Sequence, residues 1–89
     1  MYPTYYGCEI KPSKTADKEM VNLKIYLDDV LRILEEGKDA SRSKRKKGTI
    51  EKSLRIRGKM VKVVVVESMT RWSNEKVWLI IHVGEIHEK

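Results

Sequence analysis

The segment GTIEKSLRIRGKMVKVVVVE, which spans residues 48–67, decides the fold. Apolar residues alternate with polar ones before Gly58, and the half that follows it contains four consecutive valines. Alternation with a period of two is typical of β-strands, and a glycine between two such runs is typical of a tight hairpin turn. The segment therefore predicts a β-hairpin at the centre of the protein.

The two faces of this hairpin follow from its register. We expect Gly58 and Lys59 to be the two turn residues, which places Leu54 opposite Val63. The face expected to form the core carries Ile50, Leu54, Ile56, Val61, Val63 and Val65. The other face carries Glu51, Ser53, Arg55, Arg57, Lys62, Val64 and Val66. An element with an apolar face must bury it, so we expect a helix to pack on the first face.

Residues 14–36 predict helical structure. Their apolar residues recur in alternating steps of four and three, which places them on one side of a helix. Ser13 is the expected N-cap, and Gly37 is expected to end the helix because glycine tolerates a positive φ. Three further apolar residues lie off this stripe: Ile25, Tyr26 and Ile33. The region is therefore either one long helix or a pair of helices broken at residues 24–26.

Four other segments complete the predicted fold. Residues 76–83, KVWLIIHV, predict a third strand, and residues 1–12, which contain two prolines, predict an irregular segment or an edge strand. Residues 38–47 predict a basic loop, and residues 84–89 predict a frayed tail. The prediction is one α+β domain, in which a long helix or a helical pair packs on an antiparallel sheet of three strands, or of four with the edge strand.

The composition argues against several kinds of site. Cys8 is the only cysteine in the 89 residues, so no internal disulfide can form. Cys8, His82 and His87 lack the spacing of a zinc site, and no motif predicts a cofactor. The apolar runs are too short to cross a bilayer, which favours a cytoplasmic protein without a membrane partner. Charged residues make up 36% of the chain and glutamine is absent, a pattern that resembles proteins from hot environments.

Positive charge is concentrated in residues 42–62. That segment holds a single acid, Glu51, and ten basic residues: Arg42, Lys44, Arg45, Lys46, Lys47, Lys52, Arg55, Arg57, Lys59 and Lys62. This segment therefore has a charge of +9. The rest of the chain has a charge of −3, which gives the net charge of +6. Such a concentration favours binding to a polyanion, most simply RNA, or to an acidic protein. All of these basic residues except Lys52 are the predicted nucleic-acid contacts.

The second face of the predicted sheet carries apolar residues that need a cover. In the predicted register these are Val64, Val66, Trp78 and Ile80. Because exposed apolar patches usually mark interfaces, homodimerisation or binding of a partner protein is one interpretation. The alternative is that the N-terminal segment covers this face internally. The tyrosines of that segment are either a lid on the core or a platform for stacking bases: Tyr2, Tyr5 and Tyr6.

The order of these elements resembles that of a known superfamily. Residues 25–37, IYLDDVLRILEEG, resemble the second helix of RelE/ParE-type toxins, and more closely that of the small uncharacterised prokaryotic domains related to them. Residues 55–67, RIRGKMVKVVVVE, resemble their central hairpin, and residues 77–83, VWLIIHV, resemble their last strand. Where the related domains often carry histidine and arginine on the first helix, this chain has Thr15, Glu19 and Leu23. The resemblance implies a ribonuclease that cleaves ribosome-bound mRNA without a metal, or an inactive relative.

Three residues are the catalytic candidates. Arg55 and Arg57 are the hairpin groups comparable to those such ribonucleases use, and His82, near a strand end, can exchange protons near neutral pH. The leading interpretation is an RNA-contacting, toxin-like domain whose partner is RNA or the ribosome. The alternative is an interaction module with no nucleic-acid role, either dimeric or bound to an acidic antitoxin-like protein.

Overall fold

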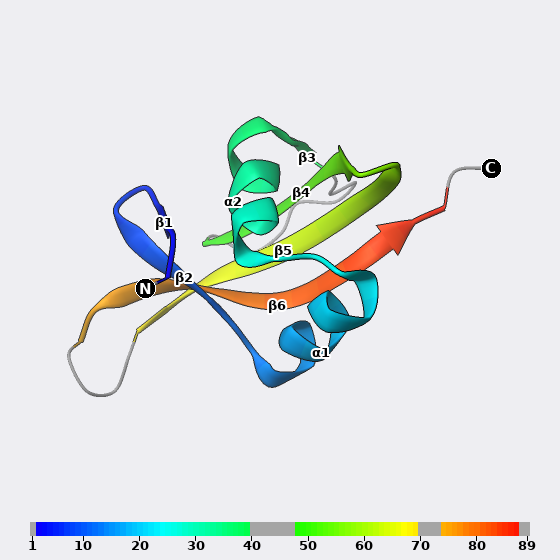
Figure 1. Ribbon diagram of the computed structural model, residues 1–89. Coiled ribbons are helices and arrows are strands. Elements are labelled where there is room, and N and C mark those ends of the chain that lie inside the picture. The colour runs from blue at the N-terminus through cyan, green and yellow to red at the C-terminus, as the bar shows by residue number, and fades with distance from the viewer. Residues whose placement is uncertain (1, 40–47, 70–73, 88–89) are drawn as a thin grey trace.

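The protein forms two layers, a curled mixed sheet and a pair of helices on one of its faces (Figure 1). The computed structural model describes residues 2–39, 48–69 and 74–87. Within these residues the sheet has six strands in the order β1-β2-β6-β5-β4-β3. The elements are β1 (Thr4–Tyr5), β2 (Cys8–Pro12), α1 (Lys14–Leu23), α2 (Leu27–Glu36), β3 (Lys38–Asp39), β4 (Thr49–Ile56), β5 (Lys59–Met69) and β6 (Lys76–Ile86).

The predicted hairpin is present as β4 and β5, but its turn lies one residue earlier than predicted. Arg57 and Gly58 are the turn residues, with φ of 46° and 84°. Positive φ at both positions is the geometry of a type I′ turn, whose twist matches that of the strands. Leu54 consequently faces Val61 and not Val63. This shift of two residues leaves the side chains within β4 and β5 on their predicted faces, because side chains alternate with a period of two.

A β-bulge in β6 rearranges the predicted outer face. Val64 pairs with His82 and Val65 with Ile80, so Ile81 is an extra residue between them. The bulge turns Ile80 onto the same face as Val65, into the core. A strict alternation from Val77 to Val83 cannot reveal such an extra residue, so the predicted third strand is present but its faces are not those predicted.

The predicted interface is therefore wrong. Trp78 and Ile80 are 7% and 0% exposed and belong to the core, while Val64 is buried and Val66 is half-buried. These four residues do not form a contiguous exposed patch. The reason is the bulge, which moves Trp78 and Ile80 to the face that the helices cover.

The predicted antiparallel sheet of three or four strands is also wrong. The N-terminal segment supplies β1 and β2, and β2 lies inside the sheet, pairing in parallel with β6 through Ile10 and Trp78. Parallel neighbours need a crossover connection, and the two helices provide it. They carry the chain from β2 across the sheet to β3 and β4, and the β4–β5–β6 meander brings it back. Strands of two to five residues are too short for a recognisable alternation.

Two predicted irregular segments begin with regular structure. Residues 84–86 belong to β6, so the tail predicted from Gly84 is wrong for these three residues. Residues 38–39 form β3, which pairs with β4 through Lys38 and Ser53. The remainder of the predicted basic loop, residues 40–47, lies outside the described residues, as do residues 88–89 of the tail.

Of the two alternatives for residues 14–36, the structure has the helical pair. Ser13 caps α1 as expected, because its Oγ accepts a hydrogen bond from the backbone N–H of Ala16 at 3.1 Å. Lys24 ends α1 in the left-handed conformation, with φ of 58°. Asp29 then caps α2, since its Oδ2 accepts a hydrogen bond from the Tyr26 N–H at 2.9 Å. The break lies at the position that Ile25 and Tyr26 indicated.

Gly37 ends α2 for a different reason from the one predicted. Its φ is −75°, which any residue can adopt. A Cβ at this position would lie 2.7 Å from the backbone oxygen of Ser53 on β4, and it would also collide with the carbonyl oxygen of Ile33. Glycine is required here because the end of α2 touches the sheet backbone, and left-handed geometry plays no part.

The core lies between the helices and the inner face of the sheet. Val30, Ile33 and Leu34 of α2 are fully buried against β4 and β5, where Val61 and Val63 are fully buried in turn. Each such side chain contributes about 1.5–3 kcal/mol through burial. The remaining buried members of this core are Tyr5, Ile10, Ala16, Met20, Ile25, Ile56, Val65, Trp78, Ile80 and Val83.

Tyr5 is part of a lid on this core. Its hydroxyl donates a hydrogen bond to the Leu34 carbonyl at 3.2 Å, and its own carbonyl accepts one from Nε1 of Trp78 at 3.0 Å. Burial raises the pKa of the Tyr5 hydroxyl above its ordinary value. Tyr2 and Tyr6 remain exposed. The lid interpretation is thus correct for Tyr5.

Candidate hairpin-tip site

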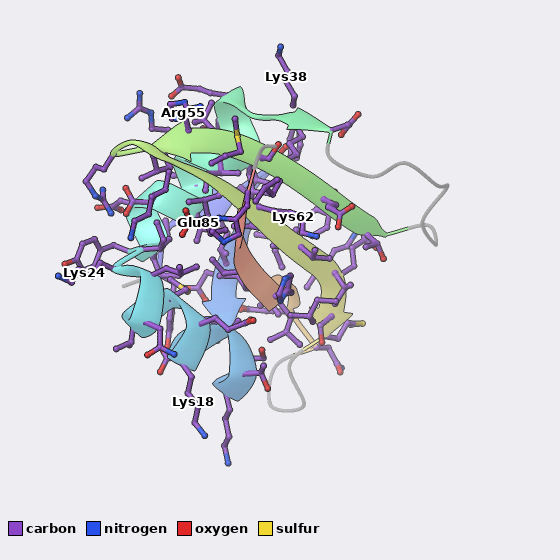
Figure 2. The ribbon with its side chains drawn as sticks, turned by 90° about the vertical axis from the view of Figure 1, so that its right-hand side faces the viewer. Lys18, Lys24, Lys38, Arg55, Lys62 and Glu85 are labelled. Atoms are coloured by element: carbon purple, nitrogen blue, oxygen red, sulfur yellow. The ribbon has the colours of Figure 1, made fainter. Side chains whose placement is uncertain are left out.

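The basic residues predicted on the hairpin occupy three different environments. Arg55 and Lys59 lie at the tip, next to the turn, and both are exposed. Among the described residues neither has an acidic partner, and the one hydrogen bond of Arg55 runs from Nη1 to the Gly58 carbonyl at 3.4 Å. Their positive charges are therefore available to a ligand. Figure 2 views the molecule from this end, with Arg55 labelled.

A shallow hollow of about 190 Å³ lies at this tip. We call it the tip hollow, and its lining residues are Arg55, Gly58, Lys59, Met60, Glu85, Ile86 and His87. The sheet register places three of them in one row on the outer face, because Met60 pairs with Arg55 on one side and with Ile86 on the other. Glu85 pairs with Val61 and therefore lies on the opposite face of the sheet. Sequence reasoning identified Arg55 and Lys59 but missed Glu85, Met60 and Ile86. Glu85 and Ile86 lie in the segment that was predicted to be a frayed tail, residues 84–89.

Arg57 does not belong to this site. Its guanidinium forms a bidentate pair with Asp29, with Nη1–Oδ1 and Nη2–Oδ2 distances of 3.0 and 2.9 Å. Nη2 also donates to the Lys24 carbonyl at 2.6 Å, and the guanidinium lies 5.7 Å from the centre of the Tyr26 ring. The hydrogen bonds from Arg57 lower the pKa of the Asp29 carboxyl, and the hydrogen bond from the Tyr26 N–H acts in the same direction.

The expectation that Arg57 shares a face with Arg55 is therefore wrong. Residues i and i+2 share a face only within a strand, and Arg57 is a turn residue with positive φ. Its side chain consequently contacts the corner between α1 and α2. Arg57 is a structural clamp, and its role as a catalytic or nucleic-acid contact is not supported by this geometry.

Lys62 lies farther along the outer face of the sheet (Figure 2). Its Nζ is 3.7 Å from Oε1 of Glu51, whose side chain is only 4% exposed. A buried carboxylate needs a compensating cation, so Lys62 has a structural role that competes with ligand binding. Lys62 thus differs from Arg55 and Lys59, neither of which forms an ion pair with an acidic side chain among the described residues.

His82 forms a second site with a residue from the first helix. Its Nδ1 lies 3.0 Å from Oε2 of Glu19, and Oε1 of Glu19 also accepts the backbone N–H of Val83 at 3.1 Å. The other ring nitrogen, Nε2, lies over Gly84, where a Cβ would come within 2.9 Å of it. The sequence indicated His82 but could not indicate its partner, because 63 residues separate the two and only the docking of α1 on β6 joins them.

The remaining predicted nucleic-acid contacts lie outside the described residues: Arg42, Lys44, Arg45, Lys46 and Lys47. The segment that holds them rejoins the described chain at Gly48, immediately before β4. The eight residues of β4 separate that point from the hairpin turn by about 25 Å at the usual rise per residue. Gly48 and the tip hollow therefore lie at opposite ends of the strand.

Comparison with protein-family models, with curated proteins and with solved structures finds no match. Within the residues that the structure describes, no three His, Cys, Asp or Glu side chains are grouped so that they could hold a metal ion. No helix in the same part of the chain is long and apolar enough to span a membrane. Function is therefore argued from the tip hollow and from the His82–Glu19 pair.

Proposed function

We propose that this protein binds RNA at the hairpin tip, with Arg55 and Lys59 contacting phosphates. One observation carries the proposal: these two cations flank the hairpin turn, one toward each face of the sheet, both are exposed, and neither has an acidic partner among the described residues. Some other exposed basic side chains of the described chain are used in ion pairs, such as Arg57 with Asp29 and Lys76 with Glu67. The other exposed lysines without an ion pair among the described residues lie on or beside the helices, outside the basic segment 42–62: Lys14, Lys18, Lys24 and Lys38. The tip is thus a place where positive charge is not already neutralised.

The charge of the whole chain supports the same proposal. A net charge of +6, concentrated in residues 42–62, raises the local concentration of a polyanion around this half of the molecule. Contacts of lysine and arginine with phosphates release counterions, so they give affinity that falls steeply with salt and contains little sequence information. We expect RNA binding with those two properties.

The dimeric form of the alternative, an interaction module, has lost the surface on which it was based. Two of its four interface residues, Trp78 and Ile80, lie in the core. No other described observation favours dimerisation over RNA binding, so the RNA proposal takes precedence.

Binding to a short single-stranded RNA, measured by fluorescence anisotropy at roughly 50 and 200 mM salt, tests the proposal. We expect the affinity of the wild type to fall several-fold between the two salt concentrations, and the Arg55→Ala/Lys59→Ala variant to bind more weakly at both. The matched control is Lys14→Ala/Lys18→Ala, which removes the same charge from the exposed side of α1. The proposal would be contradicted if the two double variants weakened binding equally, or if the affinity for RNA were the same at both salt concentrations.

The His82–Glu19 pair favours a second function, cleavage of the bound RNA. A histidine whose Nδ1 is held by a carboxylate presents Nε2 as a proton acceptor. Nε2 of His82 would take the proton of a ribose 2′-hydroxyl while that oxygen attacks the adjacent phosphorus. The P–O5′ bond breaks, the 5′ oxygen takes a proton from water, and a 2′,3′-cyclic phosphate remains. The resemblance of residues 25–37, 55–67 and 77–83 to RelE/ParE-type toxins implies the same activity.

Cleavage is tested with isolated RNA and with translating ribosomes. We expect products ending in a cyclic phosphate, and loss of cleavage when a single ribose at the cleaved position is replaced by deoxyribose. His82→Gln should abolish cleavage while leaving RNA affinity within about twofold, since His82 is not in the tip hollow. Cleavage that survives in His82→Gln would remove the assignment of His82 as the base.

A further inference from the structure

A second hollow lies at the corner where α1 meets α2, and its lining is largely apolar. Its volume is about 400 Å³, which falls within the roughly 300–1,000 Å³ of pockets that hold small organic groups. We call it the corner hollow, and its apolar lining residues are Met20, Val21, Ile25, Tyr26 and Leu27. Val21 and Tyr26 are 69% and 66% exposed, so this apolar surface is open to a ligand.

Arg57 places the corner hollow beside the hairpin tip. Its Nη2 donates to the Lys24 carbonyl at 2.6 Å, and its guanidinium lies 5.7 Å from the centre of the Tyr26 ring. Lys59, two residues further along the chain, lies opposite Ile56 and therefore on the face of the sheet that the helices cover. The Tyr26 ring and the tip cation Lys59 thus lie on the same side of the sheet, at the same end.

Charge is arranged unevenly along the corner hollow. Lys24 lies at the end nearest the hairpin turn, is exposed and has no acidic partner among the described residues (Figure 2). Asp17 is the only acid in the lining, and it precedes Lys24 by seven residues, which is about 10 Å along the axis of α1. A ligand with a negative group and an apolar ring therefore suits the hollow in one orientation, with the negative group toward Lys24 and Lys59.

An unpaired nucleotide combines those two groups. Its base is a flat ring that stacks on an exposed aromatic side chain, and its phosphates carry the negative charge. The ion pair between Arg57 and Asp29 holds the guanidinium that contacts Tyr26, so the ring is positioned before RNA binds. Bases inside a duplex are paired and stacked on one another, so they do not reach this ring. An apolar protein segment would leave the charges of Lys24 and Lys59 without a partner, and the nucleotide is favoured for that reason.

We infer that the corner hollow is a stacking subsite for one unpaired base of the bound RNA, in which the base lies against Tyr26 while Lys24 and Lys59 contact the flanking phosphates. This inference rests on the proposed RNA binding and adds a preference for single strands to it. Because the lining beside the ring is apolar, it offers few hydrogen bonds to base edges, and we expect little discrimination among the four bases.

The test uses the full chain, a short unstructured RNA, and the same RNA annealed to its complement. We expect the wild type to bind the single strand about tenfold more tightly than the duplex, which is within the range that one stacked base supplies. Tyr26→Leu keeps an apolar side chain but removes the ring, so it should weaken binding of the single strand about tenfold and leave binding of the duplex within about twofold. Its salt dependence should be that of the wild type, because no charge is removed. Tyr26→Phe should bind like the wild type, and so should the matched control Tyr6→Leu, which changes an exposed tyrosine in the β1–β2 turn.

The outcomes separate this inference from the proposed function. Salt-sensitive binding of equal strength to the single strand and to the duplex would overturn the stacking subsite and leave RNA binding intact. Unchanged affinity in Tyr26→Leu, or the same loss in Tyr26→Phe as in Tyr26→Leu, would overturn the role of the ring and favour a protein segment as the occupant of the corner hollow. Absence of salt-sensitive binding to either RNA would overturn the proposed function, and the subsite with it. Circular dichroism and thermal unfolding of each variant establish that it is folded.

Discussion

Arg57 joins the hairpin turn to the corner between the two helices. It occupies a backbone conformation that is uncommon for a residue with a side chain, and its guanidinium bonds Asp29 and the carbonyl that ends α1. The planar fork of arginine matches a carboxylate with two parallel hydrogen bonds, which lysine cannot reproduce. One side chain therefore fixes the position of the helical layer over the tip of the sheet.

We predict that Arg57→Asn lowers the stability of the protein at neutral pH. Asparagine suits the first position of a type I′ turn, so the variant removes the clamp without straining the turn. Arg57 holds the pKa of Asp29 below its ordinary value of 3.8, so this stabilisation is fully present above that pH and is lost as the pH falls through the lowered value. The difference in unfolding free energy between wild type and variant should therefore narrow below pH 3.8.

Urea unfolding at several pH values measures that difference, and an NMR titration of Asp29 in the variant should show its pKa raised toward the ordinary value. A stability difference that stays constant down to the lowest pH would show that Arg57 does not act through Asp29.

At Gly37, adding a single methyl group should lower the stability of the protein. Gly37→Ala places a Cβ 2.7 Å from the Ser53 carbonyl oxygen, and backbone atoms on both sides prevent a simple side-chain adjustment. We expect a loss of about 1–3 kcal/mol, the range for forcing an extra methyl into a closed space. Lys38→Ala at the adjacent exposed position should change stability by less than about 0.5 kcal/mol. Thermal unfolding of the two variants makes the comparison, and equal melting temperatures would refute the close contact.

At the scale of whole elements, α1 takes the place of a strand at the edge of β6. Strand β2 pairs with β6 only as far as Ile80, where the backbone N–H of Ser13 bonds the Ile80 carbonyl. Beyond that point Glu19 of α1 accepts the N–H of Val83 and contacts His82. The part of β6 beyond Ile80 has no neighbouring strand on this side among the described residues, and α1 covers its backbone polar groups.

We predict that Glu19→Ala loosens this contact. The Val83 amide, in a residue that is 1% exposed, would lose its acceptor, and an unsatisfied buried donor costs about 1–3 kcal/mol. Glu19→Gln retains a carbonyl oxygen for the same amide and should recover most of the stability. Hydrogen exchange of the Val83 amide should be faster in the alanine variant and close to wild type in the glutamine variant. Identical exchange in both variants would indicate that this hydrogen bond does not hold α1 in place.

Elements with a long, regular pattern were predictable, and those that depend on distant pairing were not. The alternation of residues 48–67 predicted β4, β5 and the inner face of the sheet, and the apolar residues off the helical stripe indicated the break at residues 24–26. The bulge at Ile81 was not predictable, because an extra residue in a continuously apolar strand leaves the composition unchanged. The parallel pairing of β2 with β6 joins short segments far apart in the chain, which no local pattern records.

The candidate site was also predictable only where it depends on residue type and not on contacts between distant segments. Arg55 and Lys59 were identified because charge is visible in a sequence. Glu85 at the tip and Glu19 beside His82 were not assigned to their sites, because strand pairing and helix docking bring them there. The wrong assignment of Arg57 came from extending the alternation of a strand into its turn.

At the scale of the whole molecule, charge is distributed unevenly between the layers. The exposed side of α2 carries Asp28, Glu35 and Glu36, while the hairpin tip presents Arg55 and Lys59. RNA approaching this protein would be repelled by the first surface and attracted to the second. The distribution would therefore favour one orientation of an RNA strand, if RNA binds as proposed: over the tip and away from α2.

The dependence of RNA affinity on salt tests the role of the tip most directly. For a single-stranded nucleic acid the logarithm of affinity falls with the logarithm of salt concentration by about 0.7 for each neutralised phosphate. Loss of two contacts in Arg55→Ala/Lys59→Ala should therefore make the slope shallower by about 1.4. The Lys14→Ala/Lys18→Ala control should retain the slope of the wild type. A slope unchanged in the tip variant, or reduced equally in both variants, would contradict the proposal that this protein binds RNA at the hairpin tip.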